Sequence, residues 1–143
     1  MEHPMMTKAA KGIDAIRMLR RGEAGPYEYP DDAASRLYYA LYHACWAFLQ
    51  SQSPPVPFDE KPDYQGDPDS YAHSKLEGHL LRFPAFTKAA GDDWRANLSA
   101  ALRNRIQADY RPDPVVSFKV ERVADKVGHV INGLDGFLKG QRL

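Results

Sequence analysis

Hydrophobic residues recur at helical spacing in five stretches of the chain, and no stretch shows the alternation typical of a strand. The expected helices run from about Thr7 to Arg21, Pro30 to Gln50, Ser70 to Arg82, Asp92 to Tyr110 and Val115 to Leu138. The second has the clearest pattern, with one apolar face made of Ala34, Leu37, Tyr38, Leu41, Cys45 and Phe48. Helices of this length with short connections favour an all-α fold, an antiparallel bundle of four or five helices.

Capping and proline signals set the expected helix boundaries. Thr7 is placed to cap the first helix, and Asp31 and Asp32 put negative charge at the start of the second. The third helix is expected to end at Phe83-Pro84, because the residue before a proline avoids helical geometry. A long apolar stripe is expected along the last helix, formed by Val116, Val120, Val123, Val127, Val130, Ile131, Leu134 and Phe137.

An acidic, proline-rich segment at about residues 51–68 separates the second and third helices. It holds five of the eleven prolines, and its acidic residues outnumber its single base, Lys61. Proline removes amide donors, so this segment is expected to be a loop. Because no repeat or second composition class follows, residues 1–143 are expected to form a single helical domain.

Composition argues against a disulfide scaffold, a metal site, a membrane span and attraction of nucleic acid by net charge. Nineteen Lys and Arg balance nineteen Asp and Glu, so no global field attracts nucleic acid or an anionic membrane. A lone cysteine, Cys45, excludes an internal disulfide, and His73 and His79 are six apart, which is not a one-face metal spacing. No metal or cofactor is therefore expected. Because no apolar run approaches the roughly 20 residues of a membrane span, a cytoplasmic protein is expected.

The helix at 92–110 carries polar residues in two directions. Its inward face is expected to hold Trp94, Leu98, Ala101 and Leu102. Arg105 and Asp109 fall on that same face one turn apart, whereas Arg103 and Tyr110 fall on the opposite face. An arginine that points into a bundle needs a partner, because an unpaired buried charge is costly.

The helix at 30–50 has a comparable second face. Arg36, Tyr39 and His43 lie away from its main apolar stripe. One interpretation is a structural network in which Arg36, Arg105 and Asp109 lock the two helices together. The other is a ligand site or an RNA-phosphate site made from the same residues. A helix with two such faces is expected to have a second partner, either in this chain or in a dimer mate.

Two motifs resemble a known family. Residues 32–44, DAASRLYYALYHA, resemble the SRxYYAxxHA helix of the HEPN superfamily, and in particular of its small stand-alone members. Residues 105–110, RIQADY, resemble the RxxADY element that follows in those proteins. The resemblance extends from about Asp31 to Phe137, and His73 lies where this branch often has a histidine.

The resemblance implies an up-down antiparallel four-helix bundle with a short additional helix, paired as a homodimer. Many members of the family are metal-independent ribonucleases that gather an R-x4–6-H motif from two subunits. Others have lost catalysis and bind RNA or ligands, or partner a minimal nucleotidyltransferase in two-gene toxin–antitoxin modules. In some modules that transferase modifies a tyrosine just after the catalytic histidine.

Carried onto this chain, the resemblance assigns Arg103 and Asn104 to the opening of the catalytic motif and Tyr110 to the modifiable tyrosine. The histidine position holds Ala108, which cannot move a proton, so His43 is the first candidate to replace it. The predicted function is a dimeric HEPN protein of a bacterial toxin–antitoxin or defence system, possessing endoribonuclease activity if a base is supplied.

The alternative is a catalytically degenerate HEPN subunit that partners a nucleotidyltransferase or binds RNA or a nucleotide. A third interpretation is a purely structural bundle. The expected nucleic acid is RNA rather than DNA, with no membrane partner. From residue 99 onward the chain has eight Lys and Arg and five Asp and Glu, whereas the loop at about 51–68 is acidic. Because acidic residues repel phosphates, any RNA cleft is expected away from that loop.

Overall fold

The computed structural model describes residues 3–17, 27–57 and 68–141, with side chains described in these ranges except at 68–73 and 141. Over these residues the chain is all-helical, as the hydrophobic periodicity predicts. Its helices are α1 (Pro4–Arg17), α2 (Pro30–Gln50), α3 (Pro68–Leu80), α4 (Pro84–Ala90), α5 (Trp94–Tyr110) and α6 (Ser117–Gln141). None of these helices is long and apolar enough to cross a membrane.

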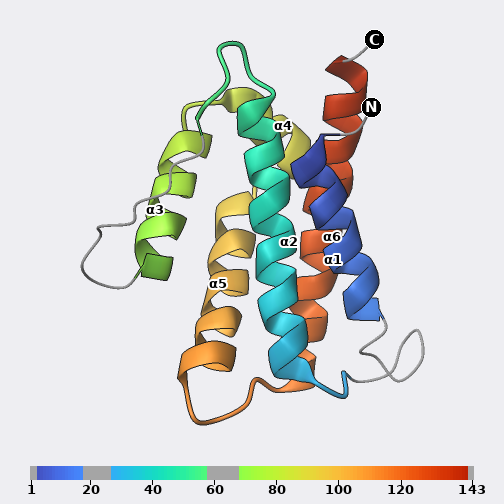
Figure 1. Cartoon of the computed structure of the whole chain (residues 1–143), viewed down its shortest axis with the longest axis vertical. Coiled ribbons are helices and arrows are strands. Elements are labelled where there is room, and N and C mark those ends of the chain that lie inside the picture. Colours follow the sequence, from blue (N-terminus) through green and yellow to red (C-terminus); the bar gives the residue numbers. More distant parts are fainter. Residues whose placement is uncertain (1–2, 18–26, 58–67, 142–143) are drawn as a thin grey trace.

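The longer helices lie lengthwise beside one another, with α2 in the middle (Figure 1). The chain descends through α1 and α5 and ascends through α2 and α6, while α3 stands outside α5 and α4 lies near the upper end (Figure 1). α2 packs against α1, α5, α6 and α3. This central place makes α2 the main wall of the hydrophobic core.

The composition of α2 explains its central place. Its predicted apolar face is buried, and so are Trp46 and Ala47 on its second face. Small residues allow a close approach of α1: a Cβ added to Gly12 would lie 3.2 Å from the Cβ of Ala40. Helices of its own chain thus cover the part of the second face at Trp46 and Ala47, whereas Arg36 and Tyr39 on that face are exposed.

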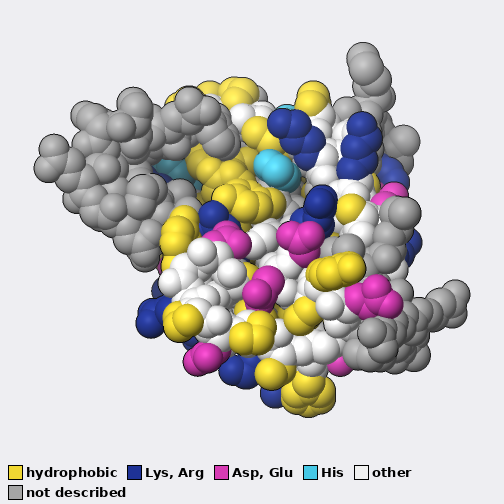
Figure 2. Space-filling view, turned by 60° about the horizontal axis from the view of Figure 1, so that its bottom comes forward, with side chains coloured by type: hydrophobic (Ala, Val, Ile, Leu, Met, Phe, Trp, Pro, Cys, Tyr) yellow, Lys and Arg dark blue, Asp and Glu magenta, His cyan; other side chains and the backbone are white. Residues whose placement is uncertain are grey.

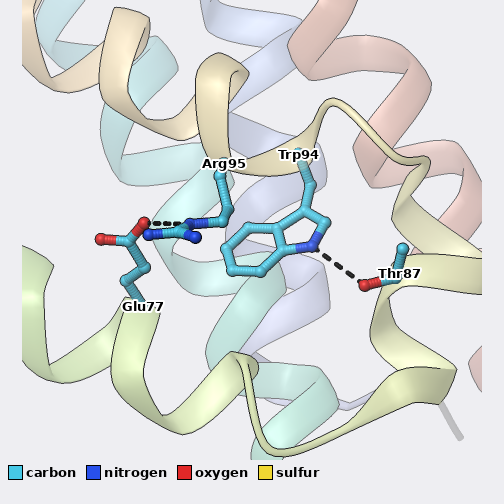
Figure 3. Close-up of polar contacts among 4 residues, drawn as sticks. All are labelled: Glu77, Thr87, Trp94 and Arg95. Carbon is cyan, nitrogen blue, oxygen red and sulfur yellow. Dashed lines mark hydrogen bonds and ion pairs between the residues drawn. The ribbon is translucent and has the colours of Figure 1, made fainter.

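The segment between α3 and α5 contains a helix, α4, that the sequence patterns do not predict. Phe83-Pro84 ends α3, as expected, but Pro84 also begins α4, because proline is well suited to the first turn of a helix. Trp94 donates a 3.1 Å hydrogen bond from Nε1 to Oγ1 of Thr87, and Arg95 pairs with Glu77 at 2.6 Å (Figure 3). These contacts attach α3 and α4 to the start of α5.

The predicted start of the first helix differs from the structure. α1 begins at Pro4, because His3 Nδ1 accepts the amide proton of Met5 and the hydroxyl of Thr7 donates back to the His3 carbonyl. Thr7 is therefore inside the helix and does not cap it. The expected end of this helix at Arg21, and residues 58–67 of the acidic loop, lie outside the described residues.

The apolar stripe of α6 begins later than predicted. Val116 is 56% exposed, whereas Val115 is buried and donates its backbone N–H to Oδ1 of Asp31 at 2.8 Å. The inward face of α6 starts at Val120. Gly133 on this helix faces α4 so closely that an added Cβ would lie within 2.0 Å of the Ala89 carbonyl oxygen.

Candidate functional site

Two arginines on α5 point to opposite sides of the helix. Arg103 and Arg105 are two residues apart, which places them about 200° apart around the axis. Arg105 is only 5% exposed, whereas the side chain of Arg103 reaches solvent. The predicted inward direction of Arg105 and outward direction of Arg103 are both confirmed.

Arg105 is the centre of a network that joins α5 to α2. Its Nη2 donates to the hydroxyl of Tyr39 at 2.6 Å, and its guanidinium lies 4.7 Å from the centroid of the Tyr39 ring. Its Nε lies 3.3 Å from Oδ2 of Asp109, while Ser35 donates to Oδ1 of Asp109 at 2.6 Å. Arg105 therefore has a carboxylate partner on α5 and a hydrogen-bond partner on α2, and these contacts join the two helices.

The membership of this network corrects the predicted one. The sequence pattern assigned Arg36 to it, but the described contacts of Asp109 come from Ser35 and Arg105. Arg36 is exposed beside this network. Its neighbour Ser35 turns toward α5, and a short hydroxyl reaches the carboxylate there. Polar contacts do link α2 to α5, but α2 contributes the hydroxyls of Ser35 and Tyr39 in place of the guanidinium of Arg36.

His43 lies one turn beyond Tyr39 on α2. Its ring stacks on Tyr39 at 6.4 Å between centroids and meets Tyr42 edge-on at 5.9 Å. Burial, and secondarily the positive charge of Lys8, lower the pKa of His43 below its usual value. The neutral imidazole is therefore favoured.

Figure 2 shows the lower front of the molecule, where hydrophobic side chains gather beside a histidine and charges of both signs are interspersed.

A groove of about 460 Å³ lies on the other side of α5, between α5 and α6. Its walls combine small apolar residues, amides and four cationic side chains, and include no carboxylate. The lining residues are Ala96, Asn97, Ala100, Arg103, Asn104, Gln107, Lys119, Arg122, Val123 and Lys126. A concave surface of a single charge sign concentrates ions of the opposite sign, so this groove suits an anion.

The cations of α6 form one row. Lys119, Arg122 and Lys126 follow the i, i+3, i+7 spacing that places residues within about 60° of one another on a helix. The acidic residues between them, Glu121 and Asp125, do not line the groove. Arg103 faces this row from α5. The positive character of the groove is thus local, because the whole chain has a formal net charge of +0.

Amide side chains brace the groove. Asn104 is 9% exposed, and its Nδ2 donates to the backbone carbonyl of Lys119 at 3.3 Å. Gln107 donates from Nε2 to the carbonyl of Pro114 at 3.2 Å. Asn104, predicted as a catalytic residue, therefore holds the start of α6 against α5. Tyr110 is 63% exposed at the end of α5 and does not line the groove.

The structure divides the predicted site residues into two groups. Arg103 and Asn104 meet at the groove, whereas Tyr39, Arg105 and Asp109 form the network on the opposite side, beside His43. Within one chain, His43 therefore lies on the other side of α5 from Arg103. Ala108 is half-buried and does not line the groove either.

The cations of α6 were missed by the sequence interpretation. The i, i+3, i+7 spacing of Lys119, Arg122 and Lys126 is visible in the sequence. These three cations form a binding groove only because Arg103 lies opposite them on α5. That relation follows from the packing of α5 against α6, which the sequence does not show.

Within the described side chains, no group of three His, Cys, Asp or Glu residues is placed to hold a metal ion. The side chain of His73 lies outside that set. Comparisons with protein-family models, curated proteins and solved structures give no match.

Proposed function

We propose that the chain is a HEPN-type domain that binds RNA through the groove between α5 and α6. The proposal includes the up-down four-helix arrangement of α1, α2, α5 and α6, with α3 and α4 as additions. It is supported by the two sequence motifs, by the opposite directions of successive long helices, and by the position of Arg103 on the groove.

The observation that carries the proposal is the charge of the groove. Arg103, Lys119, Arg122 and Lys126 line it without any carboxylate. Phosphate contacts supply most of the sequence-independent affinity of nucleic-acid binding, and Arg and Lys make most of them. RNA bound here would release counterions, so its affinity should fall steeply with salt.

Binding is favoured over cleavage by the geometry within one chain. Metal-free cleavage needs a group that takes or gives a proton next to the scissile phosphate. The position of the family histidine is Ala108, which does not line the groove, and His43 lies on the opposite side of α5. We therefore propose a catalytically degenerate member.

The cellular context is proposed from the resemblance alone. It comprises a homodimer, a bacterial toxin–antitoxin or defence module, a minimal nucleotidyltransferase as partner and a cytoplasmic location. Co-purification of the chain with the product of the neighbouring gene tests the partner. A neighbouring product that is not a transferase, or that does not co-purify, would contradict this part of the proposal.

The binding proposal is tested by titrating a fluorescein-labelled 20-nucleotide RNA of random sequence with the protein. With four phosphate contacts at roughly 0.7 each, log K against log salt should have a slope of about −3. Arg103→Ala should weaken binding and make that slope less steep by roughly 0.7, the value of one phosphate contact.

The matched control is Lys139→Ala. Lys139 is an exposed cation of α6 that pairs with Asp135 at 2.7 Å and does not line the groove. It should leave affinity and salt slope unchanged. A flat salt dependence, or equal effects of the two substitutions, would overturn RNA binding at this groove.

Cleavage by a site shared between two copies is a second candidate, which one observation favours. The neutral form of His43, favoured by its lowered pKa, is the form that accepts a proton. If Arg103 of one copy meets His43 of another, Arg103→Ala and His43→Ala should each be inactive, and a mixture of the two should recover part of the activity. Absence of cleavage by the unsubstituted protein, or no recovery in the mixture, rejects this candidate.

A further inference from the structure

Phe118 is an aromatic residue at the start of α6 that the core does not use. It is 65% exposed, and it lies about 200° around the helix from the buried Val120. Its ring therefore cannot turn into the bundle without reversing the face that α6 buries. The core of the bundle therefore does not include this ring.

The ring of Phe118 adjoins the groove. The guanidinium carbon of Arg122, which lines the groove, lies 5.7 Å from the centroid of the Phe118 ring. Lys119 follows Phe118 directly and also lines the groove. One exposed aromatic face is thus placed at the edge of the positively charged surface, with an arginine held against it.

The cations of α6 lie at different heights along the groove. From Lys119 to Lys126 the helix rises by about 10 Å, at 1.5 Å per residue. A single phosphate would have to draw the ends of all three side chains away from this row to one point. An extended chain of phosphates can contact all three in place, because it follows the helix. The row therefore favours a polyanion strand over inorganic phosphate or a mononucleotide.

We propose that the strand in the groove is single-stranded, with its phosphates along Lys119, Arg122 and Lys126 and an unpaired base stacked on Phe118. This inference rests on the proposed function and adds which form of RNA is bound and which residue contacts a base. Aromatic side chains beside a basic groove stack on bases of any sequence, and only unpaired bases expose a face for this contact. The site should therefore prefer single strands without strong sequence preference.

The test compares three labelled probes of the same length, a 12-nucleotide single-stranded RNA, the same sequence as a duplex, and a 12-unit abasic strand. The abasic strand retains the phosphates and removes the bases. The single strand should bind the unsubstituted protein about 10-fold more tightly than the abasic strand, as expected for one stacked base. The duplex should bind more weakly than the single strand at equal phosphate concentration.

Three variants assign the effect to a residue. Phe118→Ala should remove the advantage of the single strand over the abasic strand while leaving the salt slope unchanged, and Phe118→Trp should retain it. Arg122→Gln should lower affinity for both strands and reduce the salt slope. Leu81→Ala is the control for loss of an exposed hydrophobic side chain, since Leu81 is 54% exposed near α4 and away from the groove.

The outcomes separate this inference from the proposed function. Binding that depends on Arg103 but is equal for single strand and abasic strand, or is unaffected by Phe118→Ala, overturns the stacking inference and leaves RNA binding standing. Absence of binding to all three probes overturns both. A change of oligomeric state on Phe118→Ala, measured by sedimentation, would show that the ring is a contact between copies and would also overturn the inference.

Discussion

The two sides of α5 use the same kind of side chain in opposite ways. On one side Arg105 is enclosed by Tyr39, Asp109 and the neighbouring helix, and its charge is balanced within the chain. On the other side Arg103 faces the cations of α6 with no carboxylate in the groove. The first arrangement stabilises the fold, and the second leaves positive charge available to an anion.

The difference shows how little residue type alone reveals about role. Both arginines belong to the segment LRNRIQADY, where Arg103 was a candidate catalytic residue and Arg105 a candidate for binding RNA or a ligand. What separates them is the surface that each meets across the bundle. Arg105 has a carboxylate partner within the chain, whereas Arg103 has three cations across the groove, and their mutual repulsion falls when an anion binds there.

Replacement of Arg105 should give the largest effect on stability. Arg105→Ala removes the cation from a network that retains Asp109 and the Tyr39 hydroxyl, and we expect a loss of about 2–4 kcal/mol in the free energy of unfolding. Urea denaturation followed by circular dichroism measures it. Arg103→Ala is the matched control and should change stability by less than about 0.5 kcal/mol. Similar losses for the two variants would abolish the distinction between the two sides.

A smaller effect should follow from removing one hydroxyl. Tyr39→Phe retains the ring under the guanidinium of Arg105 but removes the hydrogen-bond acceptor at 2.6 Å. We expect a loss of about 1 kcal/mol, and RNA affinity should be unchanged, because Tyr39 lies on the side away from the groove. If Tyr39→Phe kept the stability of the unsubstituted protein and lowered its RNA affinity, the RNA would have to bind at α2 and not at the groove.

The smallest effect should appear on acidification. The pKa of His43 is lowered in the folded chain, mainly by burial, so the unfolded chain binds a proton more readily. The contribution of neutral His43 is therefore complete above the unfolded pKa of about 6.5 and is lost as the pH falls through that value toward the folded pKa.

Urea midpoints between pH 7.5 and 5.5 provide the measurement. The unsubstituted protein should lose stability relative to His43→Gln as the pH falls. His129→Gln is the control, since His129 is exposed on α6, and it should follow the unsubstituted protein. A gain in stability of the unsubstituted protein over His43→Gln at low pH would show that His43 is not held in its neutral form.

Regular periodicity allowed much of the fold to be predicted. The apolar stripe of α2 and the inward residues Trp94, Leu98 and Leu102 of α5 are buried as expected. α4 was missed because Pro84 was interpreted only as the end of one helix, although proline equally favours the start of the next. Val116 was assigned to the core on spacing, but α6 starts only at Ser117.

The site was less predictable because it depends on tertiary neighbours. The inward turn of Arg105 follows from helical phase, but its partner Ser35 depends on the register of α2 against α5. The groove contains cations and no carboxylate because of the face that α6 turns toward Arg103. Neither relation is contained in the spacing of residues along one helix.

The most direct test of the central claim is a titration of the unsubstituted protein with single-stranded RNA, followed residue by residue through backbone amide NMR shifts. The account predicts that shifts concentrate at Asn97, Ala100, Arg103, Lys119, Arg122 and Lys126, the groove residues of α5 and α6. Signals of Ser35, Tyr39 and His43 on α2 should remain in place. Shifts that concentrate on α2, with the groove residues unchanged, would contradict the account.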